Sequence, residues 1–350
     1  MKLIVVILLA LLTYFPSALM ANLQHDKCSL SDGPSLNFFS GLKATNPLPN
    51  QCKCSSTPSK DDLTSTHNST LRVMSFNILG DIWLDPNDYR PSMRPFLTQD
   101  VRNKAIDSVI TKTNPDALCL QEVTATSYQH LKNQWSKQEY HVLPFAPHTN
   151  NYWKQYLAPG KEYMDHGNAI MLRKSRFAIL ATHTHQLSSD GNTALLVLAQ
   201  DQRNKQKILI VASHLDAEAG SDVRISQSKE LVHAINHYKD GDNTVVIMGS
   251  DMNDGNPSDW PIHSNLWKSD MTNAWEVCKV EHRTHPFDNS GEPMVIDHIY
   301  ASNNTKIIES CVVDEIPQEF TGEKRFEDAL KRYGSDHFPI MADIDYRATI

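Results

Sequence analysis

The sequence predicts an α/β domain in which helices cover the faces of β-sheets, and three features predict it. From Leu71 onward, short apolar runs alternate with amphipathic stretches of helical period. Several runs are apolar at nearly every position, as at Val245–Met248, which indicates strands buried on both faces. Residues 71–346 contain no internal repeat and no second change of composition, so we expect a single layered domain.

The predicted elements follow one another along this domain. Helices are expected at residues 102–111 and 224–238, and in the second of them apolar residues gather on one side. Because apolar strands need cover on both faces, these helices are expected to lie against the sheets. The short apolar runs that predict strands are residues 71–78, 117–123, 168–172, 194–199, 208–214, 244–249, 295–300 and 338–344.

Residues 1–21 have the pattern of a signal peptide. Lys2 precedes an apolar run from Leu3 to Phe15, and small residues follow as far as Ala21. The alternative is an uncleaved membrane anchor, but the run is shorter than the roughly 20 residues that span a bilayer. The mature protein is therefore expected to be secreted, without a stable membrane anchor.

Residues 22–69 are expected to form a cysteine-containing extension and linker, followed by the layered domain at 70–350. The extension is rich in Ser, Pro, Asn and Lys and shows little periodicity. Its Cys52 and Cys54 lack a second ligand pair for zinc. Cys119 lies in an apolar run and is expected to be a core residue. The sequence does not distinguish among the pairings of the six cysteines, which are Cys28, Cys52, Cys54, Cys119, Cys278 and Cys311.

Charge and glycosylation signals narrow the class of partner. The formal net charge of -8 argues against a strongly basic nucleic-acid surface. A local basic groove, or a metal ion that offsets substrate charge, remains compatible with it. The sequons at Asn68-Ser69-Thr70 and Asn303-Asn304-Thr305 suit a secreted glycoprotein. The mature protein is expected to be a monomer.

Polar residues occur at the ends of several predicted strands, where a sheet brings side chains to a shared rim. One such residue alone is more often a capping or surface group. Several in the same setting predict a site that carries chemistry. The residues are Asn77, Glu122, His214, Asp251, Asn253, Asp297, Asp336 and His337.

In order and context, these residues resemble the endonuclease/exonuclease/phosphatase superfamily, the group that includes deoxyribonuclease I and the apurinic endonucleases. The likeness covers residues 71–345. It implies the deoxyribonuclease I-like fold, which is a four-layer sandwich of two packed mixed β-sheets flanked by helices. The segments that most resemble the deadenylase, nocturnin and angel branch are Arg72–Leu79, Pro115–Val123, His214-Leu215 with Arg224 and Gln227, and Ser335–His337.

The resemblance implies a metal-dependent hydrolase of phosphate esters. A phosphodiester is anionic, so its hydrolysis calls for a hard cation with oxygen ligands, here Mg²⁺ with Mn²⁺ as the alternative. Glu122 is the side chain most expected to bind the metal. Asn77 is expected to add a neutral oxygen and to contact the phosphate, although it could instead cap a turn. Asp336 is expected to reach the metal or to orient its neighbour.

The remaining residues receive roles in catalysis. Asp251 is expected to activate the attacking water, and Asn253 to donate to a phosphoryl oxygen. His337 and His214 are expected to contact the phosphate and stabilise the transition state, although His214 could be a buried structural histidine. Asp297 is expected to orient a histidine and raise its pKa.

Two departures from the superfamily pattern stand out. Ser250 occupies the position before Asp251 where the superfamily usually has glycine, and Gly249 lies one residue earlier. After His214-Leu215, nucleotide-binding relatives place basic residues, whereas this chain has Asp216 and Glu218. The second departure weakens the inference to poly(A) or to a phosphorylated dinucleotide.

Three functions are weighed. The leading one is a secreted Mg²⁺-dependent phosphodiesterase or nuclease acting on nucleic acids or nucleotides. The alternative is a phosphomonoesterase or a sphingomyelinase-like phospholipid phosphodiesterase, for which the aromatic residues of segment 150–157 would be a membrane-binding loop or a base-stacking surface. The third is an inactive binding protein, which predicts lost site residues. The histidines without an assigned role are expected to be surface or structural: His166, His183, His185 and His298.

Overall fold

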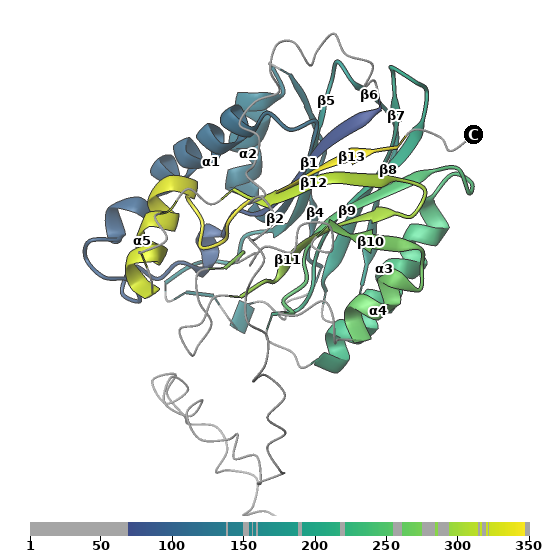
Figure 1. The fold of residues 1–350 in the computed structure, drawn as a ribbon. Coiled ribbons are helices and arrows are strands. Elements are labelled where there is room, and N and C mark those ends of the chain that lie inside the picture. The colour runs from purple at the N-terminus through teal and green to yellow at the C-terminus, as the bar shows by residue number, and fades with distance from the viewer. Residues whose placement is uncertain are drawn as a thin grey trace, which may run out of the picture. The chain divides into compact units, whose positions relative to one another are not determined.

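Two mixed β-sheets face each other in the computed structural model of the chain (Figure 1). The predicted signal peptide and extension lie outside the described residues, apart from Ser69, and stay predictions. The structure describes residues 69–346 except 138, 150–153, 156, 159, 188–190, 218–220, 255–260, 275–283, 286–293, 314–315, 317–319 and 321.

The first sheet has the strand order β12-β13-β1-β2-β5-β3, and β4 also pairs with β5. Its strands β1 and β2 run parallel, and its other pairs are antiparallel. The bounds are β1 Thr70–Asn77, β2 Ala117–Thr124, β3 Tyr140–Val142, β4 Ala146–Pro147, β5 His166–Arg173, β12 Lys306–Val312 and β13 Ile340–Asp345.

The second sheet has the order β10-β11-β9-β8-β7-β6. Strands β8 and β9 are parallel at its centre, and the remaining pairs are antiparallel. The bounds are β6 Phe177–Gln186, β7 Thr193–Asp201, β8 Lys207–His214, β9 Val245–Asp251, β10 Met271–Asn273 and β11 Asp297–Ser302.

Helices cover the outer face of each sheet (Figure 1). α1 (Gln99–Thr113), α2 (Ala125–Trp135) and α5 (Gly322–Tyr333) pack on the first sheet, and α3 (Ser221–Tyr238) and α4 (Pro261–Trp267) on the second. The predicted four-layer sandwich is therefore confirmed. Among the described residues, no helix combines the length and apolarity needed to cross a bilayer.

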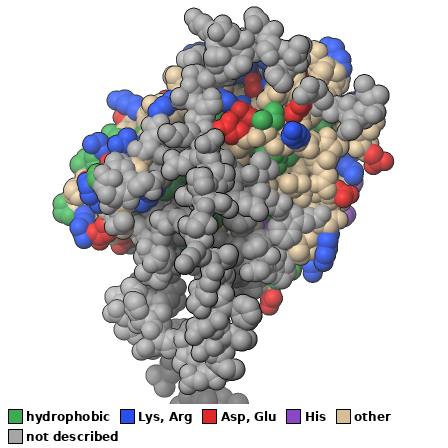
Figure 2. Space-filling model, viewed as in Figure 1, with side chains coloured by type: hydrophobic (Ala, Val, Ile, Leu, Met, Phe, Trp, Pro, Cys, Tyr) green, Lys and Arg blue, Asp and Glu red, His purple; other side chains and the backbone are tan. Residues whose placement is uncertain are grey.

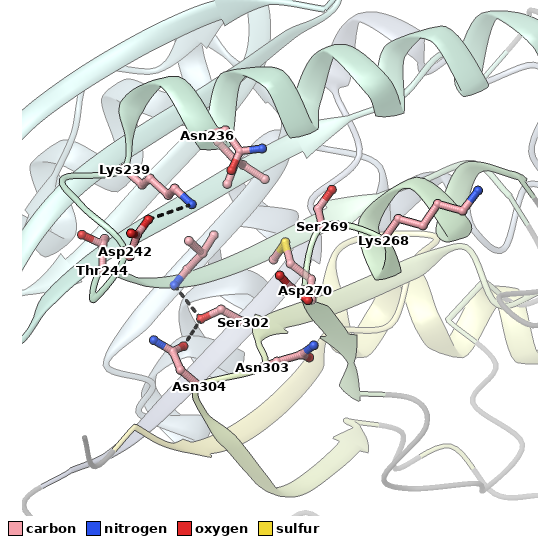
Figure 3. Close-up of a pocket in the computed structure, with 13 residues that line it drawn as sticks. Asn236, Lys239, Asp242, Thr244, Lys268, Ser269, Asp270, Ser302, Asn303 and Asn304 are labelled. Carbon is pink, nitrogen blue, oxygen red and sulfur yellow. Dashed lines mark hydrogen bonds and ion pairs between the residues drawn. The ribbon is translucent and has the colours of Figure 1, made fainter. Parts of the chain in front are cut away.

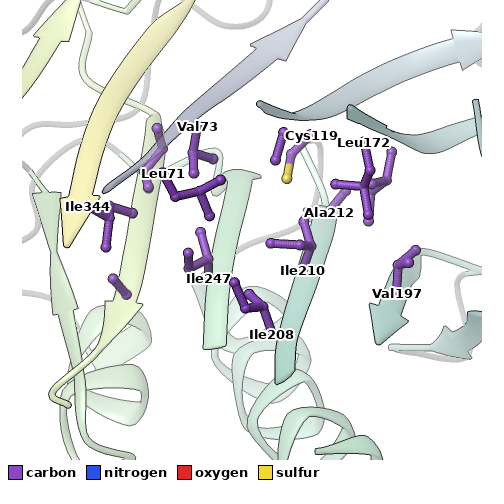
Figure 4. Close-up of a cluster of buried hydrophobic side chains, with 14 of the residues drawn as sticks. Leu71, Val73, Cys119, Leu172, Val197, Ile208, Ile210, Ala212, Ile247 and Ile344 are labelled. Atoms are coloured by element: carbon purple, nitrogen blue, oxygen red, sulfur yellow. The ribbon is translucent and has the colours of Figure 1, made fainter. Parts of the chain in front are cut away.

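The core between the sheets follows from the alternation of side chains along each strand. Leu71 and Val73 of β1 meet Ile208 and Ile210 of β8 and Ile247 of β9 in this layer (Figure 4). The intervening residues of the same strands pack on the helices instead. The strands are thus buried on both faces, which explains their continuous apolar runs.

The eight predicted strands and both predicted helices are present, with shifted ends. Sequence patterns missed β6 and β12 because each exposes alternate positions at or near a sheet edge. They also missed α5, whose residues are mostly charged, and α2, which begins directly after β2 with no linker. Periodicity detects buried strands best because exposed elements carry a weaker apolar signal.

The two cysteines in the described residues differ in state. Cys119 is free and fully buried, so the prediction of a core residue is confirmed. Burial raises the pKa of its thiol to about 12, which keeps the sulfur protonated and unreactive. Cys311 is disulfide-bonded.

The two sheets come close together at Gly249, near the end of β9. A Cβ at this position would lie 2.7 Å from the Cβ of Cys119 and 2.8 Å from the Cβ of Ser75. Both atoms belong to the opposite sheet and are fixed by their backbones. Glycine is therefore required here for contact between the sheets.

Gly249→Ala is expected to destabilise the fold by about 1–3 kcal/mol, because the added methyl overpacks the layer between the sheets. Chemical denaturation of the two proteins measures this difference. Gly322→Ala is the control, since no atom lies within 4 Å of a Cβ there and only its backbone conformation, with φ at +50°, opposes the change. Equal stability of the wild type and Gly249→Ala would contradict the close approach.

Candidate active site

The polar ends of four strands lie on the inner face of the sandwich. On β9, Ile247 and Gly249 face the opposite sheet, so alternation turns Asp251 the same way. The same alternation places Asn77 and His214 on the inner face after the inward residues of β1 and β8, and Asp297 before the inward residues of the antiparallel β11. Strand pairing sets Asp251 opposite both His214 and Asp297. The predicted site is thus the polar end of the layer between the sheets.

Glu122 reaches this site by an irregularity in β2. Alternation alone would direct it outward with Leu118 and Leu120, which pack on the helices. A bulge between Leu120 and Val123 shifts the register, and Glu122 has a left-handed φ of 56°. Bulges commonly redirect a side chain next to an active site. Here the bulge turns the carboxylate toward β1, and Oε2 accepts a hydrogen bond from the backbone N–H of Gly80 at 2.7 Å.

The Asn77 amide joins the two key carboxylates. Its Nδ2 donates to Oε1 of Glu122 and to Oδ2 of Asp251, each at 2.9 Å. Its Oδ1 accepts the backbone N–H of Leu79 at 3.0 Å. Glu122 and Asp251 therefore flank one amide group, although they come from different sheets. The amide nitrogen, rather than the oxygen, faces the carboxylates, so the role of Asn77 as a metal ligand stays a prediction.

Asn253 supports the histidine beside Asp251. Its Nδ2 lies 2.9 Å from Nε2 of His214 and donates to the carbonyl of Leu215 at 3.0 Å. Its backbone N–H donates to Oδ1 of Asp251 at 3.0 Å. The Nε2 of His214 lies 3.6 Å from Oδ2 of Asp251. Asn253 thus fixes His214 and Asp251 relative to each other, and its predicted donation to phosphate stays a prediction.

His337 and Asp297 form a buried pair. Nδ1 of His337 lies 2.8 Å from Oδ2 of Asp297, and Nε2 lies 3.7 Å from Oδ2 of Asp251. Burial alone would lower the pKa of His337, but the two carboxylates outweigh it and raise this pKa well above its ordinary value. Burial raises the pKa of Asp297, and the positive charge of His337 opposes that rise. The imidazole is therefore held as a cation between two acids.

Asp336 lies on the same loop but pairs elsewhere. Its carboxylate is 3.8 Å from Nε2 of His285, whose ring is 4.9 Å from that of His337. Burial would raise the pKa of Asp336, yet its interaction with His285 and the charge of His337 hold this pKa below the ordinary value. His285 was not among the predicted site residues, because it does not follow an apolar strand in the sequence.

Hydrogen bonds from buried side chains hold the loops of the site. The hydroxyl of Ser335 donates to the carbonyl of Asn77 at 2.7 Å and accepts the backbone N–H of His337 at 3.1 Å. The guanidinium of Arg102 donates to the carbonyls of Gly334 and Ile78, at 2.8 Å and 2.6 Å. Sequence reasoning missed Arg102, because an arginine on an amphipathic helix is expected at the surface.

Backbone strain collects at this end of the sandwich. Leu79, Glu122 and Asn253 have left-handed φ values of 57°, 56° and 48°. Such conformations are unfavourable for residues other than glycine and cluster at functional sites. Each of these residues follows a strand of the site or interrupts one. The strained backbone therefore occurs where side chains turn toward the candidate site.

The two sequence departures have structural explanations. The side chain of Ser250 points away from the inner face, and its hydroxyl lies 2.7 Å from that of Ser213. The close approach is made by Gly249, so serine before Asp251 is tolerated. Asp216 is fully buried, and Gln227 accepts its backbone N–H at 2.9 Å. Its carboxylate therefore adds no exposed negative charge, whereas Glu218 lies outside the described residues.

The histidines without assigned roles differ in burial and contacts, and their surface or structural role stays a prediction. His166 and His298 are buried, and His183 stacks on Tyr238. His185 is half-buried and bonds to Glu230. Most of the aromatic segment at 150–157 lies outside the described residues, so its role stays a prediction.

A separate cavity of about 590 Å³ lies at the opposite end of β9 (Figure 3). Its lining includes Lys239 and Asp242 beyond α3, Lys268 after α4, and Asn303 of the second sequon. It contains no group of carboxylates and histidines like that around Asp251. The cavity is therefore distinct from the candidate active site.

The donor set at the candidate site fits a divalent cation. Glu122 has no lysine or arginine within ion-pair distance among the described residues, and neither do Asp251 and Asp297. The buried Oδ1 of Asp297 has no hydrogen-bond partner among the residues that the structure describes. Donor atoms of Asp251, Asp297 and His337 lie within 4.8 Å of one another, as do those of His285, Asp336 and His337. Clustered hard oxygen donors of this kind suit Mg²⁺, Mn²⁺ or Ca²⁺.

A carboxylate cluster with a cationic histidine at the rim of a two-sheet sandwich defines a metal-dependent hydrolase of phosphate esters. The model of the Endonuclease/Exonuclease/phosphatase family matches residues 74–337, which is more than half of the chain. The chain belongs to this family. Its members are hydrolases of phosphoester bonds and typically depend on a divalent metal ion.

Two curated proteins resemble about half of the chain in sequence. Protein angel homolog 2 of Mus musculus is 28% identical over 198 residues, covering 52% of this chain and 34% of that protein. The CCR4-Not complex 3'-5'-exoribonuclease subunit Ccr4 of Emericella nidulans is 21% identical over 205 residues, covering 51% and 29%. The matched region thus spans only about a third of either relative.

Solved structures share the fold at low identity. The human Nocturnin catalytic domain with bound sulfate has a TM-score of 0.62 and 18% identity, covering 80% of this chain and 95% of that one. ANGEL2, described as a 2',3'-cyclic phosphatase, has a TM-score of 0.60 and 19% identity, covering 79% and 95%. The family match confirms the predicted superfamily, and the curated relatives are proteins of the predicted deadenylase and angel branch, to which this chain is similar.

Asp297→Asn is expected to lower the pKa of His337 in the metal-free protein, because the nearest carboxylate charge is lost. NMR titration of the histidine ring signals in the presence of chelator measures the change. Asp107→Asn is a matched control, since Asp107 contacts His130 at 2.9 Å on another part of the surface. An unchanged His337 titration in Asp297→Asn would show that the pair does not form in solution.

Proposed function

We propose that the protein is a secreted, Mg²⁺-dependent phosphodiesterase or nuclease that hydrolyses nucleic acids or nucleotides. The observation that carries the proposal is the Asn77 amide between Glu122 and Asp251, next to His337. Bringing these groups together from two sheets buries charged side chains, which costs free energy. A purely structural role does not explain this cost.

Glu122, with Asn77 and Asp336, would hold the cation. When bound, Mg²⁺ supplies Lewis acidity and offsets the negative charge of the phosphate. No lysine or arginine pairs with Glu122 within 4 Å in the described part of the chain, so its carboxylate is available for a cation.

The other site residues act on water and phosphate. Asp251 accepts the proton of the attacking water, and its orientation is fixed by the Asn77 amide and the Asn253 backbone. His337, kept cationic by Asp297, donates a hydrogen bond to a phosphoryl oxygen as negative charge develops there. His214, positioned by Asn253, contacts the phosphate from the neighbouring strand.

Substrate class is supported by relatives and by charge. The curated relatives include an exoribonuclease subunit, and ANGEL2 is described as a 2',3'-cyclic phosphatase. Where Figure 2 shows described side chains, Lys and Arg lie among Asp and Glu. The negative formal charge of the chain also gives little attraction for long polymers. These features favour nucleotides and short single strands over duplex nucleic acid.

A phosphomonoesterase on the same fold is the second candidate, because a solved Bacteroides thetaiotaomicron structure of this fold is described as a mannosyl-6-phosphatase. Both reactions use the same metal and water, so the geometry of the acidic groups serves either one. A phospholipid substrate has no comparable support among the described residues.

Secretion is part of the proposal. The apolar run at the N-terminus predicts it, and the disulfide at Cys311 suits an oxidising compartment. Asn303, the acceptor of the second sequon, lies exposed on the turn between β11 and β12. An exposed turn is accessible to the glycosylation machinery.

Glu122→Gln is expected to reduce hydrolysis by about 100-fold or more with little change in Tm, because a metal ligand is lost while the size of the side chain is kept. The substrates to compare are single-stranded RNA and DNA, a 2',3'-cyclic nucleotide and sphingomyelin, each with and without chelator. Glu139→Gln is the control, since Glu139 lies on the surface beside Arg173. Hydrolysis that survives both the chelator and Glu122→Gln would refute metal-dependent catalysis.

Asn303→Gln is expected to remove one glycan from protein produced in a secretory eukaryotic host. Mass spectrometry before and after enzymatic deglycosylation measures the change. Asn304→Gln is the matched control, because it leaves the Asn303-x-Thr305 sequon intact. Wild-type protein that is retained in cells without a glycan at Asn303 would argue against export.

A further inference from the structure

A second group of metal-ligand side chains lies away from the active site, on the face of the second sheet that α3 covers. Its donor groups are the imidazoles of His185 on β6 and His233 on α3, and the carboxylate of Glu230 on α3. β6 is the edge strand of its sheet, so the group joins an edge strand to the covering helix. None of the residues proposed for catalysis belongs to it.

The donor atoms are spaced as around a single ion. Nε2 of His185 lies 2.7 Å from Oε1 of Glu230, and Nδ1 of His233 lies 3.4 Å from the same oxygen. All three donor atoms lie within 4.8 Å of one another. Metal–ligand bonds of about 2.0–2.1 Å place neighbouring donors of a tetrahedral zinc ion about 3.3 Å apart. Small rotations of exposed side chains would therefore bring all three donors onto one ion.

The surroundings keep these side chains in place and available. His183, two residues before His185 on β6, stacks on Tyr238 with ring centroids 4.3 Å apart, and His185 meets the edge of the same tyrosine. The side chain of His233 is 70% exposed and that of Glu230 is 42% exposed, so an ion can enter from solvent.

A hydrogen-bonded surface pair is the simpler explanation for His185 and Glu230 alone. His233, one helical turn away, adds a third donor at the same carboxylate oxygen, and this completes a set that could surround one ion. Two imidazoles and one carboxylate form a ligand set that prefers zinc over Mg²⁺, whereas the active-site carboxylates have the opposite preference.

We propose that His185, Glu230 and His233 bind a zinc ion that links β6 to α3, with water or an anion as the fourth ligand. The site is separate from catalysis and does not depend on the proposed function. By tying the helix to the edge strand, the bound ion stabilises this side of the second sheet.

The test is to titrate zinc into the full chain in excess Mg²⁺. Calorimetry measures zinc binding, and the Tm measures the gain in stability. Wild type is expected to bind one zinc ion at this site and to gain about 5 °C in Tm when free zinc is 100-fold above Kd. His233→Ala is expected to weaken binding about tenfold or more and to abolish the Tm gain, while leaving the zinc-free Tm unchanged because the side chain is exposed.

Three further variants make the outcome specific. His185→Gln is expected to lose zinc binding, whereas His130→Ala, which changes a histidine–aspartate contact elsewhere, is expected to keep it. Glu122→Gln is also expected to keep it, so a failure of the catalytic proposal would not affect this result. Wild-type affinity for zinc in both His233→Ala and His185→Gln, or no zinc binding by the wild type, would overturn the proposal.

Discussion

The contact on which the candidate site depends is the pair of hydrogen bonds from the Asn77 amide to Glu122 and Asp251. Asn77 ends a strand of one sheet and Asp251 ends a strand of the other, so the contact requires the sheets to approach closely. Gly249, two residues before Asp251, permits that approach because it has no side chain. The packing of the core and the geometry of the site are therefore one constraint.

The close approach of the sheets concentrates negative charge at the partly buried candidate site. Asp251 and Asp297 are directly paired across neighbouring strands, where like charges repel. His337 lies between them as a buried cation and compensates part of that charge. Within the described part of the chain, the hydrogen-bond donors to Glu122 are neutral groups, namely the Asn77 amide and the Gly80 backbone. Buried charge of this kind is costly when unpaired, so a bound cation would relieve the repulsion as well as supply chemistry.

Strand alternation predicted a layered α/β domain with polar groups at strand ends, and the resemblance to the superfamily implied the two-sheet sandwich. Continuous apolar runs indicated strands buried on two faces, and the polar residue at the end of each run, such as Asn77 or Asp251, inherits the inward direction. The orientation of Glu122 could not be derived this way, because a bulge reverses the alternation at that residue. Arg102 and His285 were missed for another reason: a helix and a loop bring them to the site through tertiary packing, which leaves no periodic signal in the sequence.

The same sheet carries two ligand sets of different chemistry, and their placement separates them. The end of β9 gathers carboxylates on the inner face, where hard oxygen donors and partial burial suit a small, hard cation. The edge strand β6 presents imidazoles toward α3 near the surface, where borderline-soft nitrogen donors suit zinc. At the inner site Nδ1 of His337 already contacts Oδ2 of Asp297 at 2.8 Å, so carboxylate oxygens make up most of the donors there. The two sets thus differ in donor type as well as in burial, and this difference separates the cations that they suit.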